Sequence, residues 1–91
     1  MSVSVSIPTP LRTYAGGHKL VAVSAPSVGA ALGDLVSRYP GLRPHLYAET
    51  GELRGFVGLY VNDENVRDLE GAGTALAEGD TLTILPSIAG G

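Results

Sequence analysis

The chain of 91 residues is 44% hydrophobic and 16% charged, which is typical of a single globular domain and excludes an intrinsically disordered chain. It contains no cysteine, so disulfides, thiolate metal sites and a cysteine nucleophile are excluded. The net charge is −3, the six basic residues form no patch, and no apolar run approaches the ~18 residues of a membrane span, so we expect no nucleic-acid or membrane partner. The N-terminal stretch lacks the basic segment of a signal peptide, and we therefore expect a cytoplasmic protein.

The first part of the chain predicts a β-hairpin. Residues 2–7 alternate serine with valine or isoleucine, which is the pattern of a half-buried strand. Residues 19–24 predict a second strand with Val21 and Val23 facing inward. Residues 9–18 before it are expected to form a loop. Two strands joined in this way indicate an antiparallel pair.

A helix is expected next, because the hydrophobic period changes after Ser27. The Ser27 hydroxyl can accept a hydrogen bond from the first turn, and Pro40 and Gly41 stop the helix. Gly29 and Gly33 each weaken it by about 1 kcal/mol relative to alanine, so tertiary packing must stabilise it. The apolar stripe at helical spacing comprises Val28, Leu32, Leu35, Val36 and Tyr39.

The second half predicts further strands. Residues 41–55 are expected to be irregular, residues 62–65 form a tight turn, and Val66 starts a short return strand. Residues 74–80 are expected to form a brief helical turn followed by a turn at Gly79. The two main strands are expected at 56–61 and 81–85, with inward side chains at Val57, Leu59, Val61, Leu82 and Ile84.

This order of elements predicts an α+β domain of two layers, in which one helix covers one face of a four- or five-stranded sheet. The other face must meet water or a partner. Phe56, Tyr60 and Leu85 would cluster on that open face, and Ile88 could join them. Clustered exposed apolar residues usually mark an interface, although Tyr60 could instead only cover neighbouring backbone.

The remaining polar residues form no catalytic motif. His18 and His45 have no partner at metal-ligand spacing, and we interpret them as surface histidines. Gly71 to Gly73 is followed by no phosphate-binding lysine and is expected to be a turn. Eight of the nine acidic residues lie between Glu49 and Asp80. They predict solvated loops, or alternatively an acidic rim that steers a basic partner.

The C-terminus carries the most specific signal. The segment LAEGDTLTILPSIAGG closes the chain, after VSVSIPTPLR at the start and FVGLYVNDENVR in the second half. Together they resemble the ubiquitin-like sulfur carrier proteins of the ThiS/MoaD family, and most of all the CysO type that serves cysteine biosynthesis. Without that context, a terminal Gly-Gly could be a disordered polar stump.

The resemblance implies a β-grasp fold with a mixed sheet of four or five strands packed on one main helix. Residues 1–86 would form this domain, and residues 87–91 would form a flexible tail. It also implies that the chain is a protein co-substrate without a bound cofactor, not an enzyme. An ATP-dependent enzyme would adenylate the carboxylate of Gly91, and a sulfur donor would convert it to a thiocarboxylate. In the CysO type the sulfur then passes to an activated serine on a PLP-dependent enzyme, and a metalloprotease releases the cysteine. A related sulfur-transfer pathway with another acceptor enzyme stays open, since a thiazole, a pterin or a thiosugar could be served by the same fold.

Elementary chemistry agrees with this reading of the tail. A carboxylate is a poor electrophile until it is adenylated, and the terminal carbon must reach a buried phosphate. A slim arm can thread there, because glycine has no Cβ to obstruct it. We therefore expect Ile88, Ala89 and Gly90 to thread the channel after Pro86. Two other functions stay open: a non-covalent β-grasp interaction module, and a protein modifier that attaches Gly91 to lysines.

Overall fold

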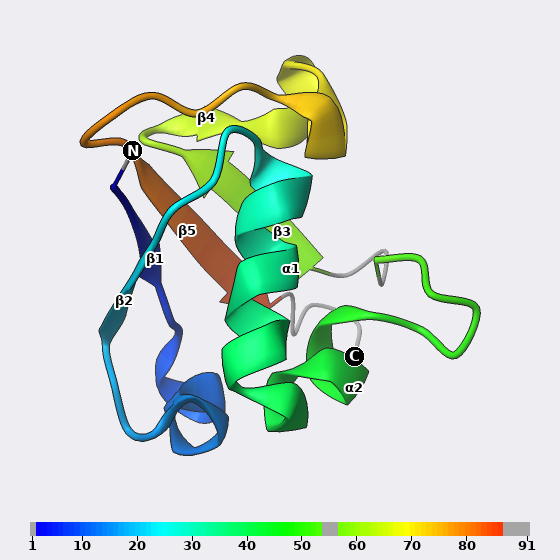
Figure 1. Cartoon of the computed structure of the whole chain (residues 1–91). Coiled ribbons are helices and arrows are strands. Elements are labelled where there is room, and N and C mark those ends of the chain that lie inside the picture. The colour runs from blue at the N-terminus through cyan, green and yellow to red at the C-terminus, as the bar shows by residue number, and fades with distance from the viewer. Residues whose placement is uncertain (1, 54–56, 87–91) are drawn as a thin grey trace.

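A computed structural model of the chain describes residues 2–53 and 57–86. A five-stranded sheet packs against one long helix and several short ones (Figure 1). None of the helices in the described ranges is long and apolar enough to cross a membrane. The strands are β1 (Val3–Ser6), β2 (Leu20–Val23), β3 (Val57–Val61), β4 (Glu64–Asn65) and β5 (Thr81–Pro86), and the α-helices are α1 (Val28–Arg38) and α2 (Arg43–Leu46).

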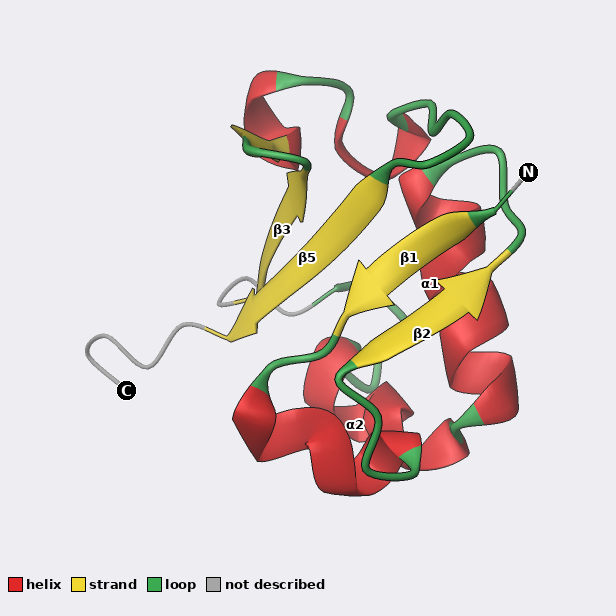
Figure 2. Cartoon of the chain, turned by 90° about the vertical axis from the view of Figure 1, so that its left-hand side faces the viewer, coloured by secondary structure: helices red, strands yellow, loops and turns green. Residues whose placement is uncertain are grey.

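The sheet is mixed, with the strand order β2-β1-β5-β3-β4. β1 and β5 are parallel at its centre, and every other pair is antiparallel. This confirms the predicted α+β class and the mixed sheet. The helices cover one face, and Figure 2 shows the opposite face of the sheet turned toward the viewer.

The core lies between the sheet and α1. Every side chain that the strand alternation predicts to face inward is at most 8% exposed, which confirms the predicted strand phases. The helix contributes Leu32 and Leu35, both fully buried, to the same cluster. The inward residues of the sheet are Val3, Val5, Ile7, Val21, Val23, Val57, Leu59, Val61, Leu82 and Ile84.

The ends of α1 follow the predicted signals. The Ala30 N–H donates to the Ser27 side-chain oxygen at 3.3 Å, so Ser27 is the N-cap. Gly29 has a packing role, because a Cβ there would lie 3.2 Å from the carbonyl oxygen of Ala72. Gly33 faces open space, since nothing lies within 4 Å of a Cβ built there.

The predicted loop at 9–18 and the irregular stretch at 41–55 contain short helices that the residue pattern did not predict. A 3-10 helix η1 (Thr9–Ala15) buries Leu11, and a 3-10 helix η2 (Pro40–Leu42) followed by α2 buries Leu42 and Leu46. Prolines, which indicated breaks, occupy first-turn positions in these helices, where the missing N–H costs nothing.

Two local predictions between β3 and β5 were wrong. The return strand is β4 rather than a strand from Val66, which instead begins a 3-10 helix η3 (Val66–Asp68). The helical turn expected within 74–80 lies earlier, as the 3-10 helix η4 (Gly71–Gly73). Ala75 is extended and bridges Ser27, because this segment pairs with the start of α1. The turn at Gly79 is confirmed, with φ of +86°.

Candidate functional site

The last strand carries the chain to its C-terminal tail. β5 lies between β1 and β3, and its side chains Leu82 and Ile84 are 0% and 1% exposed. The pairing continues to Pro86, which lies opposite Val57. The point where the tail begins is therefore held by the centre of the sheet. The predicted tail residues Ile88, Ala89, Gly90 and Gly91 lie outside the described residues, and their roles stay predictions.

The structure brings together two members of the predicted partner face. Leu85 is 48% exposed and Tyr60 is half-buried, and both lie on the open face. Gly58 lies between them, since a Cβ there would be 3.6 Å from Tyr60 Cε1 and 3.7 Å from Leu85 Cβ. The third predicted member, Phe56, lies outside the described residues. Tyr60 and Leu85 thus form one apolar surface beside the start of the tail.

The open face continues across the sheet without charge. Thr83 pairs with Tyr60 on one side and with Ser6 on the other, and Ser6 pairs with Leu20. Leu20 is 55% exposed, and the sequence analysis did not assign it to the partner face. The alternation that places Val21 inward could have predicted that Leu20 faces outward. The outward residues of β1, β2, β3 and β5 contain no Asp, Glu, Lys or Arg. Depletion of charge is typical of the centre of a protein interface.

The acidic residues lie mostly at the other end of the sheet. Six of the eight acids counted between 49 and 80 fall in residues 62–80, which lead into the start of β5. Asp80 accepts from Asn62 Nδ2 at 3.3 Å and from the Ala77 N–H at 2.9 Å. Glu78 accepts from the Ser2 N–H at 2.8 Å. Asp80 and Glu78 therefore shape loops, which supports the loop interpretation for these two, while steering by the others stays a prediction.

Two aromatic rings, one from η1 and one from α2, pack on each other. The rings of His45 and Tyr14 have centroids 4.2 Å apart. Burial raises the pKa of Tyr47, and the Arg43 guanidinium, 5.4 Å from the ring centroid, partly opposes the shift.

Within residues 2–53 and 57–86, no three His, Asp or Glu side chains gather as metal ligands. We find no nucleophile and base arranged for catalysis in this part of the chain.

Comparison with known proteins points to one family. The profile of the ThiS family matches residues 5–91. The chain is 48% identical to the sulfur carrier protein CysO of Mycobacterium tuberculosis over the full length of both chains. It also matches a chain in the crystal structure of the Amycolatopsis orientalis BexX/CysO complex, with 46% identity, a TM-score of 0.87 and coverage of 98% of this chain and 99% of that one. This likeness confirms the β-grasp fold. A more distant relative is the small archaeal modifier protein 3 of Haloferax volcanii, 38% identical over 71% of this chain and 70% of that protein.

Proposed function

Because the chain belongs to the ThiS family, we propose that it is a ubiquitin-like sulfur carrier whose terminal Gly91 carboxylate is adenylated and converted to a thiocarboxylate. The sulfur is then donated in cysteine biosynthesis. The observation that carries this proposal is the 48% identity to a CysO sulfur carrier along both full chains. The position of β5 supports it, since the strand that precedes the tail is anchored at the centre of the sheet.

The chemistry needs two displacements, the first at the α-phosphorus of ATP and the second at the carboxyl carbon of Gly91. The carboxylate oxygen attacks the α-phosphate of ATP, and pyrophosphate leaves. Sulfide then attacks the acyl carbon, AMP leaves, and the product is a thiocarboxylate with one oxygen replaced by sulfur. Both steps require catalytic groups of a partner enzyme. This chain supplies the reacting carboxylate and a side-chain-free approach at Gly90 and Gly91, so it acts as co-substrate and binds no cofactor itself.

The adenylating partner docks on the open face beside the tail. Leu85 directly precedes Pro86, so contact at Leu85 and Tyr60 fixes the point from which the tail enters the partner's active site. The face is apolar there and uncharged across β1, β2, β3 and β5, as an interface centre requires. The BexX/CysO complex supports the proposal, because it shows that a protein of this type binds a partner chain.

Two further partners follow from the assignment to cysteine biosynthesis. A PLP-dependent cysteine synthase accepts the sulfur, and a metalloprotease releases the product and restores the glycine end. All of these steps are placed in the cytoplasm. The acceptor is chosen by the partner enzyme, since the carrier presents only its tail and one face.

The decisive experiment is intact-mass spectrometry of the full-length protein after incubation with an activating enzyme, ATP and sulfide. We expect a mass gain equal to the exchange of one oxygen for sulfur. A variant that lacks Gly91 should stay unchanged, as should a reaction without ATP. If the full-length protein keeps its mass while a known carrier is converted under the same conditions, the proposal is wrong.

A second function has one observation in its favour. The identity to a small archaeal modifier protein would suit a chain that attaches Gly91 to lysines of other proteins. Isopeptide-linked bands of higher mass in an ATP-dependent reaction would reveal this. The third candidate, a non-covalent interaction module, would form complexes that are insensitive to ATP and to removal of the tail.

A further inference from the structure

Among the strands of the described residues, β2 lies at one edge of the sheet and pairs only with β1. The Ile7 N–H donates to the Lys19 carbonyl at 2.9 Å, which fixes residues 19, 21 and 23 as those bonded to β1. Leu20 and Ala22 alternate with them, so their N–H and C=O groups point away from the sheet. Such unpaired groups are a template for another strand.

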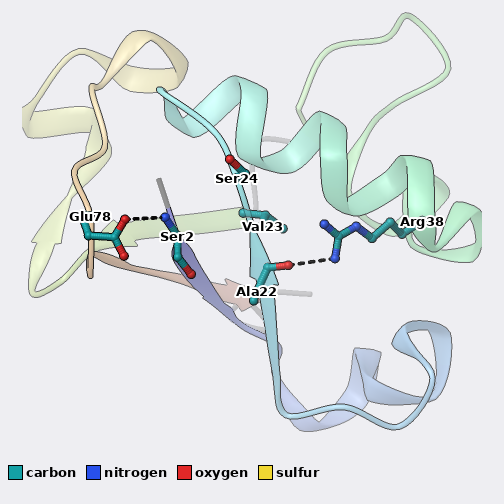
Figure 3. A pocket seen from close by; sticks show the side chains of 6 residues that line it. All are labelled: Ser2, Ala22, Val23, Ser24, Arg38 and Glu78. Atoms are coloured by element: carbon teal, nitrogen blue, oxygen red, sulfur yellow. Dashed lines mark hydrogen bonds between the residues drawn. The ribbon is translucent and has the colours of Figure 1, made fainter.

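A side chain of α1 occupies one of these outward groups. Arg38 Nη1 donates to the Ala22 carbonyl at 2.8 Å (Figure 3). Arg38 Nη2 donates to Asp34 Oδ2 at 3.1 Å. The guanidinium therefore takes the place that the N–H of a neighbouring strand would occupy. In the described part of the chain, Leu20 and Ala22 lie opposite Ser6 and Ser4, at the ladder positions whose N–H groups do not bond to β1.

The edge runs along a groove between β2 and α1. One hollow is lined by Ala22, Ser24 and Arg38, with Ser2 and Glu78 at its far side (Figure 3). A second hollow is lined by Leu20, Ala22 and Arg38, together with the ring of His18 before β2 and the ring of Tyr39 after α1. Arg38 and Ala22 belong to both, so the two hollows meet at the capped carbonyl.

Charge decides what the groove can accept. The face of an added strand that looks toward α1 meets Arg38, and the alternation of β2 places Lys19 on that same side. Asp34 is already paired with Arg38, and Glu78 lies at the Ser24 end. A carboxylate next to Arg38 would replace the bond to the Ala22 carbonyl and free that oxygen for the new strand.

We infer that the β2 edge is a second docking surface, separate from the Tyr60 and Leu85 face, and that it binds an extended segment of a partner protein. The segment pairs with Leu20 and Ala22 and directs acidic side chains toward Arg38. A second copy of this chain fits less well, because pairing of two β2 edges about Ala22 would bring two Arg38 guanidiniums together.

The test is a titration of the full ¹⁵N-labelled chain with two synthetic peptides, followed by NMR. One peptide is Thr-Val-Asp-Val-Glu-Val-Thr, and the other carries lysine in place of both acids. We expect the acidic peptide to move the Leu20 and Ala22 amide protons downfield and the lysine peptide to have little effect. Arg38→Glu should weaken binding of the acidic peptide about five- to tenfold and strengthen binding of the lysine peptide. Arg67→Glu, the same charge change beside the opposite edge strand, is the matched control.

A backbone variant tests the pairing directly. Ala22→Pro removes an outward N–H and fixes φ at about −65°, both of which an edge strand tolerates, and it should weaken binding of the acidic peptide about tenfold. If that variant loses its folded spectrum, the reversal at Arg38 still decides. Shifts confined to Tyr60 and Leu85, or no shift at millimolar peptide, would overturn the inference. So would shifts at Leu20 and Ala22 that depend on protein concentration without peptide, because they would assign the edge to a second copy.

Discussion

Replacing Leu85 by threonine probes the docking face without disturbing the fold. Threonine is β-branched, which strands favour, and it removes most of the apolar surface of the leucine side chain. Fully burying a leucine contributes about 1.5–3 kcal/mol, and 48% of Leu85 remains exposed in the free protein. Covering that share in a complex therefore contributes about 1 kcal/mol to binding. The Kd for the adenylating enzyme should rise about fivefold.

The assay is isothermal titration calorimetry of the protein with the proposed activating enzyme. Leu69→Thr is the matched control, because Leu69 is 38% exposed but follows η3, away from the end of β5. Its Kd should change by less than about twofold. The circular dichroism spectra of both variants should match that of the wild type, which shows that both are folded. If Leu85→Thr binds as tightly as the wild type, or if Leu69→Thr loses as much affinity, the face formed by Tyr60 and Leu85 is not where the enzyme docks.

Three further predictions concern the fold and its pH dependence. Gly33→Ala should raise the free energy of unfolding in urea by about 0.5–1 kcal/mol, because its Cβ meets open space. Gly29→Ala should raise the free energy of unfolding by less, because its Cβ would lie 3.2 Å from the Ala72 carbonyl oxygen. An equal increase would show that η4 moves away from α1 at no cost in stability. Ser27→Ala should lower the Tm, with a loss of about 1 kcal/mol from the missing cap, and an unchanged Tm would contradict the capping role. Burial raises the pKa of Tyr47 in the folded state, so its contribution to stability is complete below the unfolded pKa of about 10 and is lost as pH rises through the folded value. As the pH rises above that value, the free energy of unfolding in urea should therefore fall less for Tyr47→Phe than for the wild type. Equal pH dependence of the two proteins would refute the raised pKa of Tyr47.

The strands and the main helix were predictable because their patterns are periodic and local. The alternation around Val57 and Leu59 and the stripe containing Leu32 and Leu35 each place side chains on one face of one element. The short helices were not predictable, because one or two turns hold too few residues to show a period. Pro40 was expected only to stop α1, yet it also lies in the first turn of η2, as Pro44 does in α2. Burial of Leu42 and Leu46 against the core stabilises these turns.

The sequence by itself determined which side chains face the core and that the chain ends in glycines after an apolar strand. These properties depend on spacing along the chain and on the absence of a Cβ. Only the tertiary structure decided which strands lie together. The parallel pairing of β1 with β5 joins residues 4–6 to residues 81–83, and no local pattern encodes a contact of that separation. That pairing leaves β2 at one edge of the sheet and puts β5, with the start of the tail, at its centre. The docking face and the open edge both follow from it.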